Sequence, residues 1–267
     1  MSTFLSYYKK SFKIMIQWRW GFAISLLIDP MVLLINISLF TSIYNYNNTQ
    51  NILGYSLSQM IWYFAGTSFI WYLTYNFTDR NISTGILSGD IAVLLLKPVS
   101  IMKVELAEAL ALRTNGLLFE FIPSLILYSL IYHPDFLSIF SLLRFLTVII
   151  FAFSINFLLN FLIGISAFVI KSNFSLQSLK SAVVGLLAGV FFPIDFFPDF
   201  IQNIASYLPF QYIFYVPIQV FLNKSNTNSL EGFMQIILIM LIWTVLLYVL
   251  CKVLWSKAVK RFCAVGG

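Results

Sequence analysis

The 267-residue sequence has little charge, one histidine and two cysteines. Charged residues make up 10% of the chain, against about 25% in an ordinary soluble domain. His133 stands alone and Cys251 and Cys263 are distant from it, so neither a metal site nor a disulfide framework is expected. The Gly-(x)4-Gly-Lys-Ser/Thr phosphate loop is also absent, which excludes the usual mode of ATP binding. We therefore expect no catalytic residue and no cofactor on this chain.

Hydrophobic residues are abundant: they make up 60% of the chain, and the mean hydropathy is +0.89. This composition is typical of a polytopic membrane protein, and no cleavable signal peptide is evident at the N-terminus. We predict an all-α integral membrane protein in which residues 1–267 form a single transmembrane domain. Its six predicted spans cover residues 20–44, 58–77, 110–132, 138–170, 181–197 and 233–255.

Residues 1–19 are predicted to form an amphipathic helix at the membrane interface. Phe4, Tyr8, Phe12 and Met15 share one face, and lysines occupy the opposite face. A basic helix of this kind lies along an anionic cytoplasmic leaflet. The same residues can also be interpreted as a basic flank that orients the first span, and the two interpretations are compatible.

The basic residues determine the predicted orientation. Of the 16 Lys and Arg, only Arg144 and Lys224 fall on one side of the six-span layout. The positive-inside rule then places both termini in the cytoplasm, and we expect a multi-pass protein of the bacterial plasma membrane. Membrane topology explains the positive charge without nucleic acid as a partner. The other fourteen are Lys9, Lys10, Lys13, Arg19, Arg80, Lys97, Lys103, Arg113, Lys171, Lys180, Lys252, Lys257, Lys260 and Arg261.

The largest cytoplasmic loop, residues 79–103, mixes polar turns with the apolar run 91–96. Asp79 can cap a short helix here, and Gly85 and Gly89 can end it. A short helix with exposed apolar side chains suits a groove on another protein, but an interfacial helix with no partner fits equally well. The predicted docking residues are Asp79, Arg80, Ile82, Thr84, Gly85, Ile86, Leu87, Gly89 and Asp90.

The stretch 185–217 carries four of the eight prolines, so it cannot be one straight span. Within it, Pro198–Leu208 has the pattern of a short amphipathic helix. We predict that residues 192–217 form an external re-entrant hairpin; a kinked span followed by an ordinary surface helix is the alternative. The candidates for an outer gate are Phe192, Pro193, Phe197, Pro198, Leu208, Pro209 and Phe210.

Four polar residues within the predicted spans are candidates for a substrate path. Asn156 and Asn160 share a face of the fourth span, where they either line a path or form interhelical hydrogen bonds, and we favour the second interpretation. Glu120 either binds a cationic substrate or pairs with a neighbouring helix. Asp29 is costly in lipid and should face other helices or water.

The order of these elements resembles the ABC type-2 exporter permeases. The resemblance rests on the N-terminal amphipathic helix, the cytoplasmic Gly-Ile-Leu-Ser-Gly-Asp loop with its later Lys-Pro-Val-Ser, and the external Phe-Phe-Pro, Phe-Pro and Leu-Pro-Phe motifs. It covers nearly the whole chain. It implies two permease chains, identical or different, assembled with two ATPase subunits that carry ATP and Mg. Residues 79–89 would be the coupling helix, and residues 192–210 would close the path.

We therefore expect a non-catalytic permease subunit that exports an amphipathic substrate: a drug, an organic cation, a hydrophobic peptide or a lipid-like molecule. The abundant aromatic residues suit such a molecule. A gradient-driven secondary transporter or channel is the alternative, although only one half of the chain contains a broken segment. A membrane-embedded enzyme is disfavoured because a single histidine cannot supply clustered catalytic groups.

Overall fold

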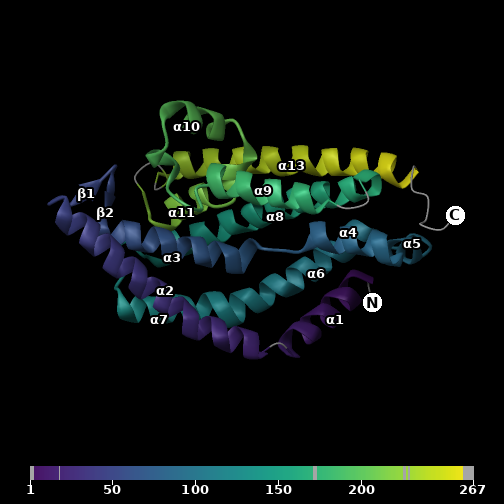
Figure 1. Ribbon diagram of the computed structural model, residues 1–267, viewed down its shortest axis with the longest axis horizontal. Coiled ribbons are helices and arrows are strands. Elements are labelled where there is room, and N and C mark those ends of the chain that lie inside the picture. The colour runs from purple at the N-terminus through teal and green to yellow at the C-terminus, as the bar shows by residue number, and fades with distance from the viewer. Residues whose placement is uncertain (1–2, 18, 171–172, 225–226, 228, 261–267) are drawn as a thin grey trace.

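The computed structural model describes residues 3–17, 19–170, 173–224, 227 and 229–260. Lys171, Arg261 and Cys263, which entered the sequence analysis, lie outside those residues. Long helices run side by side along one axis and form an all-α bundle, with one small β-hairpin at its end (Figure 1). The elements are α1 (Thr3–Gln17), α2 (Arg19–Tyr46), β1 (Asn51–Ile52), β2 (Tyr55–Ser56), α3 (Leu57–Thr74), α4 (Thr78–Ser88), α5 (Asp90–Leu95), α6 (Ile101–Gly116), the π-helix η1 (Leu117–Phe121), α7 (Ile122–Ile131), α8 (Ile139–Ile170), α9 (Phe174–Leu187), η2 (Ile194–Phe196), α10 (Asp199–Ser206), η3 (Pro209–Tyr212), α11 (Tyr215–Phe221) and α13 (Leu230–Lys260).

Four helical segments among the described residues are long and apolar enough to cross a membrane: Leu27–Tyr46, Ile101–Ile131, Ile139–Ile170 and Leu230–Lys260. The second of these comprises α6, η1 and α7 in one continuous rod, so helix begins at Ile101 rather than at residue 110. The end of the predicted loop 79–103 is therefore helical.

The fifth predicted span differs most from the structure. Helix α9 covers Phe174–Leu187, whereas the sequence predicted a span over 181–197. Gly189 has a φ of +77°, a left-handed conformation that glycine adopts without strain and that ends the helical path. Phe191 packs where a Cβ on Gly185 would lie, so the chain folds back at this point. Residues 188–197 consequently form a turn and the short η2 helix.

Helix α11, at the end of the proline-rich stretch, is inserted into the core. Phe221 of α11 packs against Trp62 and Phe69 of α3 and Phe145 of α8, with ring centroids 5.1–6.0 Å apart. Tyr128 of α7 packs against the same α3 rings. Large aromatic side chains bury much apolar surface, so this cluster fixes the returning segment firmly against α3 and α8. By contrast α10, between η2 and η3, projects from the bundle (Figure 1).

Helix α1 packs along α6 through the predicted apolar face. Phe4, Tyr8, Phe12 and Met15 are all partly buried, and the Tyr8 hydroxyl donates to Thr114 Oγ1 at 2.9 Å. Lys9, Lys10 and Lys13 are exposed on the other face. The amphipathic pattern thus serves contact with a neighbouring helix of the same chain.

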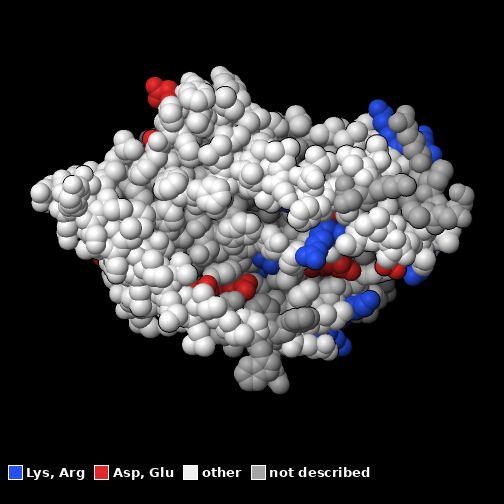
Figure 2. All heavy atoms as spheres, in the orientation of Figure 1, with Lys and Arg blue, Asp and Glu red and all other residues white. Residues whose placement is uncertain are grey.

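The start of α1, the end of α13 and the α4–α5 unit all lie at one end of the molecule, and the β-hairpin lies at the other (Figure 1). The visible Lys and Arg side chains gather toward the α4–α5 end, whereas α10 carries acid near the opposite end (Figure 2). A chain that crosses a membrane an even number of times has its first and last helices on the same side of that membrane. The charge distribution follows the pattern expected of a membrane protein.

Candidate functional site

The helical path is interrupted between α3 and α4, and asparagine side chains of α8 form hydrogen bonds with the backbone carbonyls of this interruption. Asn156 Nδ2 donates to the Thr74 carbonyl at 3.0 Å, and Asn160 Nδ2 donates to the Asn76 carbonyl at 3.2 Å and to its Oδ1 at 2.9 Å. The two asparagines are four residues apart, so they project from one face of α8. Because carbonyls at a helix end lack partners within the helix, these bonds satisfy groups that would otherwise be buried unpaired. Asn156 and Asn160 therefore form interhelical hydrogen bonds, and they also line a cavity of about 240 Å³, so their place along a substrate path stays a prediction.

An ion pair joins the same break to α9. Lys180 Nζ lies 2.6 Å from Asp79 Oδ2 and 2.6 Å from Asn160 Oδ1. The side chains of Lys180 and Asp79 are 17% and 8% exposed, so the pair is largely removed from water. Asp79 does not cap α4 as the sequence suggested, because Phe77 occupies the N-cap and makes no side-chain bond there. It instead ties the first turn of α4 to α8 and α9.

Helix α4 packs tightly on α8. A Cβ on Gly164 of α8 would lie 2.8 Å from Ile82 Cδ1, so glycine is required at this approach. Ile82 is fully buried, and a Cβ on Gly85 would lie 2.9 Å from the Ile91 side chain. Gly89 ends α4 with a φ of +82°, as predicted, and Gly85 does not end it. One face of α4 is therefore committed to the bundle.

The opposite face of α4 and the adjoining α5 are exposed. Leu87, Val93 and Leu96 are 57%, 54% and 87% exposed, an apolar surface at the end of the molecule. Among the nine predicted docking residues, Asp79, Ile82, Gly85 and Ile86 are buried in this chain. The partly or fully exposed members are Arg80, Thr84, Leu87, Gly89 and Asp90.

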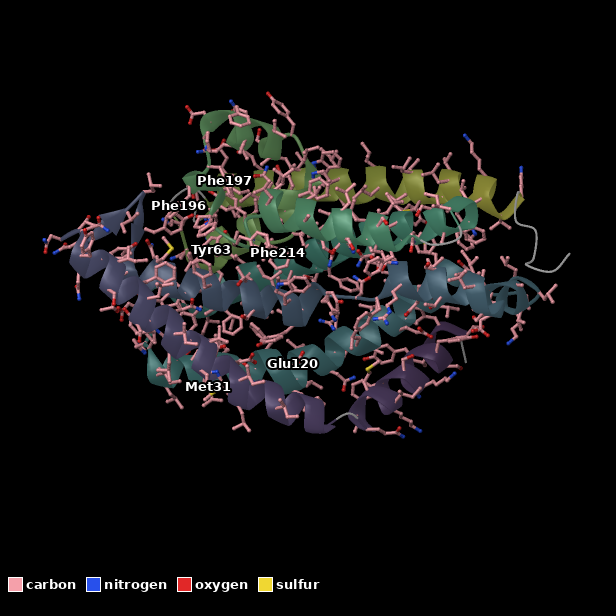
Figure 3. The ribbon with its side chains drawn as sticks, viewed as in Figure 1. Met31, Tyr63, Glu120, Phe196, Phe197 and Phe214 are labelled. Atoms are coloured by element: carbon pink, nitrogen blue, oxygen red, sulfur yellow. The ribbon has the colours of Figure 1, made fainter. Side chains whose placement is uncertain are left out.

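Two acids of the predicted spans, Asp29 and Glu120, approach each other near the middle of the bundle. Tyr72 of α3 donates its hydroxyl to Asp29 Oδ2, and the Tyr128 hydroxyl donates to the Asp29 carbonyl at 2.9 Å. Glu120 lies within range of the charges on Asp29 and Arg113. Figure 3 shows Glu120 beside the junction of α6 and α7, and acidic and basic atoms line a hollow of the visible face in Figure 2.

Glu120 lies on the π-helix η1, an irregular segment often found at functional sites. Arg113, one turn before η1, donates from Nη1 to the carbonyls of Trp71 and Tyr72 at 2.8 and 2.7 Å. Gly116 permits this approach, since a Cβ there would lie 2.2 Å from the Tyr72 oxygen. Arg113 thus satisfies the end of α3, and both acids are half-buried.

At the β-hairpin end, Asp195 joins the proline-rich stretch to the hairpin. Its carboxylate accepts from the hydroxyls of Tyr55 at 2.5 Å and Tyr215 at 2.7 Å. Gln219 Nε2 donates to the Tyr55 oxygen at 2.6 Å, and Lys224 Nζ lies 3.7 Å from the centroid of the Tyr55 ring. Burial raises the pKa of Tyr55, so its hydroxyl keeps the proton that it donates. We call Tyr55, Asp195, Tyr215 and Gln219 the Asp195 cluster.

The predicted gate residues differ in how deeply they are buried. Pro193 and Pro209 are buried, and Phe197, Leu208 and Phe210 are partly buried. Phe192 and Pro198 are exposed. Figure 3 shows Phe196 and Phe197 at the base of α10, above Tyr63, whose hydroxyl donates to the Gly189 carbonyl at 2.6 Å. These side chains pack the turn that follows α9.

Comparison with protein families gives one result that decides the class. The sequence model described as "ABC-2 family transporter protein" matches residues 31–266, nearly the whole chain. The chain belongs to the ABC-2 transporter family. No curated protein matches it.

ABC-2 membership makes this chain the membrane component of an ABC transporter, a multi-pass protein of a kind that is generally non-catalytic and works with an ATPase. The acids, histidine and cysteine of the described ranges form no group of three or more that could hold a metal ion. The predicted resemblance to ABC type-2 permeases is thus confirmed.

Several residues of this ABC-2 protein's sites were not predicted from its sequence. Lys180 was counted only as a basic residue of a loop, and Tyr72, Tyr55 and Tyr215 were not singled out. The chain has 14 tyrosines, so no single one stands out. Asp29 and Lys180 each carried a signal, because a charged residue within or next to an apolar helix requires a partner.

Proposed function

We propose that this ABC-2 protein is the permease subunit of an ATP-driven exporter that moves an amphipathic substrate out of a bacterial cell. It would assemble with a second permease, identical or different, and with two ATPase subunits that bind ATP and Mg. It would cross the membrane six times with both termini in the cytoplasm, the four long apolar helices being joined by the shorter α3 and α9 as the second and fifth crossings. The exposed face of α4 and α5 would dock on the ATPase.

One observation carries this proposal: a surface helix with exposed apolar side chains is joined through its buried side to the bundle. The exposed face of α4 includes Leu87, and its first turn is held by the Asp79–Lys180 pair at 2.6 Å. A push on α4 by the ATPase would therefore reach α8 and α9 directly. A surface helix without such links would yield locally instead of moving the bundle.

The substrate path would run past Asp29 and Glu120. Two acids at half-buried positions attract a cationic or polar head group, and the neighbouring aromatic side chains suit an apolar body. The Asp195 cluster would hold the far end of the path closed. An amphipathic molecule, such as a drug, an organic cation, a hydrophobic peptide or a lipid-like molecule, fits this combination.

The docking assignment is tested with Leu87→Asp. Leu87 is 57% exposed, so aspartate there leaves the core intact, whereas aspartate at the buried Gly85 or Ile86 would disrupt folding. Burial of a leucine in an interface contributes about 1.5–3 kcal/mol, so we expect co-purification with the ATPase to weaken at least about tenfold. ATP-driven transport in proteoliposomes should fall with it.

Leu230→Asp is the matched control, because Leu230 is 69% exposed and begins α13 at the end of the bundle opposite α4 and α5. It should retain both ATPase binding and transport. Full ATP-driven transport by Leu87→Asp would contradict the docking assignment. Transport by the purified chain without any ATPase would instead favour a gradient-driven transporter or channel.

A further inference from the structure

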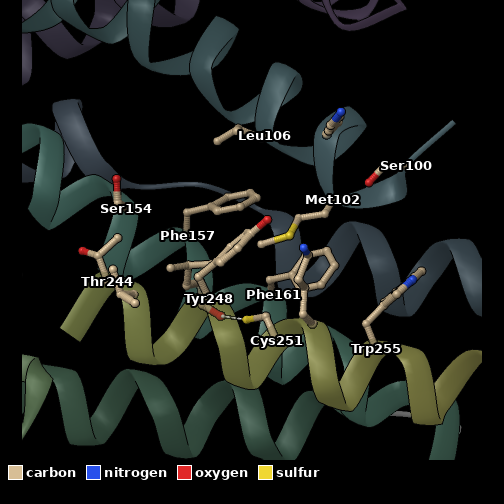
Figure 4. Close-up of a pocket in the computed structure, with 14 residues that line it drawn as sticks. Ser100, Met102, Leu106, Ser154, Phe157, Phe161, Thr244, Tyr248, Cys251 and Trp255 are labelled. Atoms are coloured by element: carbon tan, nitrogen blue, oxygen red, sulfur yellow. Dashed lines mark hydrogen bonds between the residues drawn. The ribbon is translucent and has the colours of Figure 1, made fainter. Parts of the chain in front are cut away.

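A groove of about 660 Å³ lies between α6, α8 and α13, away from the sites described above. Its walls are largely apolar and aromatic, with Phe157 and Phe161 from α8 facing Tyr248 and Trp255 from α13 (Figure 4). Cys251 closes the floor and donates from Sγ to the Leu158 carbonyl at 3.4 Å. Such a wall accepts an acyl chain but offers little to a soluble polar ligand.

The charge of the groove is of one sign. Lys103 and Lys252 line it, and its fourteen lining residues include no acid. Lys252 Nζ lies 5.3 Å from the Tyr248 ring centroid, so the ammonium group stays beside the groove. Glu105, two residues beyond Lys103, accepts from Asn81 Nδ2 at 3.3 Å and so belongs to the α4 side of α6. The groove therefore suits a ligand with a negative head and an apolar tail.

The length of the groove matches one leaflet of a bilayer. It runs along α13 from Thr244, near the middle of that helix, to Trp255, near its end. Eleven helical steps cover about 16 Å, close to half of a hydrocarbon core of about 30 Å. Both lysines belong to the part of the chain nearest the α4–α5 end, where anionic lipid attracts basic side chains.

We infer that this groove binds an anionic phospholipid of the leaflet on the α4–α5 side. Lys103 and Lys252 hold the phosphate near the Trp255 end of the groove, and one acyl chain lies along Phe157 and Tyr248 toward Thr244. Basic pockets between helices on this side of a membrane are suited to anionic head groups. Neither Asp29 nor Glu120 lines the groove, so on the proposed substrate path the bound lipid is a resident ligand and not the exported substrate.

The test uses the full-length chain in vesicles of phosphatidylcholine that contain increasing amounts of phosphatidylglycerol brominated in the part of its acyl chains nearest the head group. Bromine quenches tryptophan fluorescence on contact, and the difference between the wild type and Trp255→Phe isolates the Trp255 signal. We expect this signal to be quenched at a low fraction of phosphatidylglycerol. Brominated phosphatidylcholine should quench it only at much higher fractions.

The double variant Lys103→Gln/Lys252→Gln should weaken phosphatidylglycerol binding about thirtyfold, since one lysine near an anionic surface contributes about fivefold. Both lysines are exposed, so the core is unchanged. Lys257→Gln/Lys260→Gln removes the same charge from α13 outside the groove and should alter binding by less than about twofold. The inference is overturned if the two double variants behave alike, if both lipids quench Trp255 equally, or if neither quenches it because a second copy of the chain covers the groove. Its failure leaves the proposed function intact, because ATP-driven transport is not part of the readout.

Discussion

Replacing Lys180 with methionine should separate α4 from the bundle. The change keeps most of the apolar stem but removes the ammonium group that lies 2.6 Å from both Asp79 Oδ2 and Asn160 Oδ1. Asp79 is then left with the Arg80 backbone N–H, which donates to its Oδ1 at 2.9 Å. With 8% of its side chain exposed, the carboxylate cannot recover its hydration without moving α4.

The magnitude follows from this burial. Breaking a buried ion pair by removing one partner costs about 3–5 kcal/mol, because the other charge stays buried and unpaired. We expect about 3 kcal/mol for Lys180→Met, which corresponds to a melting temperature lower by roughly 6–12 °C for a chain of this size. Asp79→Asn should cost less, since Lys180 keeps Asn160 and is 17% exposed. The double variant should be more stable than the sum of the single losses predicts, by about 2 kcal/mol.

The assay is thermal unfolding of the purified full-length chain, followed by ATP-driven transport with the ATPase present. Lys97→Met is the matched control because Lys97 is exposed in the loop that follows α5, and it should change stability by less than about 0.5 kcal/mol. In transport, Lys180→Met should retain ATPase binding but lose most of the transport per ATP hydrolysed. Additive losses in the double variant, or unchanged coupling in a folded Lys180→Met, would refute this reasoning.

Three further outcomes are expected. Asn160→Ala should lower stability by about 2 kcal/mol in thermal unfolding, because the Asn76 carbonyl loses the Asn160 donor and Lys180 keeps only Asp79; no loss would contradict the structural role of Asn160 between α3 and α4. Asp195→Asn should lower the free energy of unfolding by about 2 kcal/mol and increase proteolysis of residues 188–198, since one amide oxygen replaces a carboxylate that accepts from two tyrosines. Unchanged cleavage would contradict the role of the Asp195 cluster in holding this segment. Gly116→Ala should strongly reduce the yield of folded protein, because the new Cβ would lie 2.2 Å from the Tyr72 carbonyl oxygen. Gly21→Ala should fold normally, because a Cβ at that position would have no atom within 4 Å.

The fold class could be predicted because membrane insertion depends on local composition. An apolar run of sufficient length must become a helix in lipid, since no water is available for its backbone groups. The long helix α8 was therefore predicted to within one residue, and the predicted span 233–255 lies inside α13, which extends from Leu230 to Lys260. Gly89 also ended α4 as predicted, because a left-handed residue is a property of the glycine itself.

The predicted helix boundaries were wrong where tertiary contacts override local composition. Helix α9 begins at Phe174, before the predicted apolar run, and ends at Leu187, where the chain folds back. Its Lys180 is accommodated because Asp79, a hundred and one residues earlier, lies beside it. Local hydropathy treats such a lysine as the end of a span, since the partner is not visible in the neighbouring sequence.

The sequence by itself determined that the chain crosses a membrane, how its charge is distributed, and that it carries no ATP-binding loop. Each of these is a sum over neighbouring residues. Only the tertiary structure decided which face of α4 is free, that Asn156 and Asn160 bind a broken backbone, and that Tyr55 and Tyr215 meet at Asp195. The physical reason is that hydrogen bonds and ion pairs act over about 3 Å, so their partners are known only once distant segments have packed together.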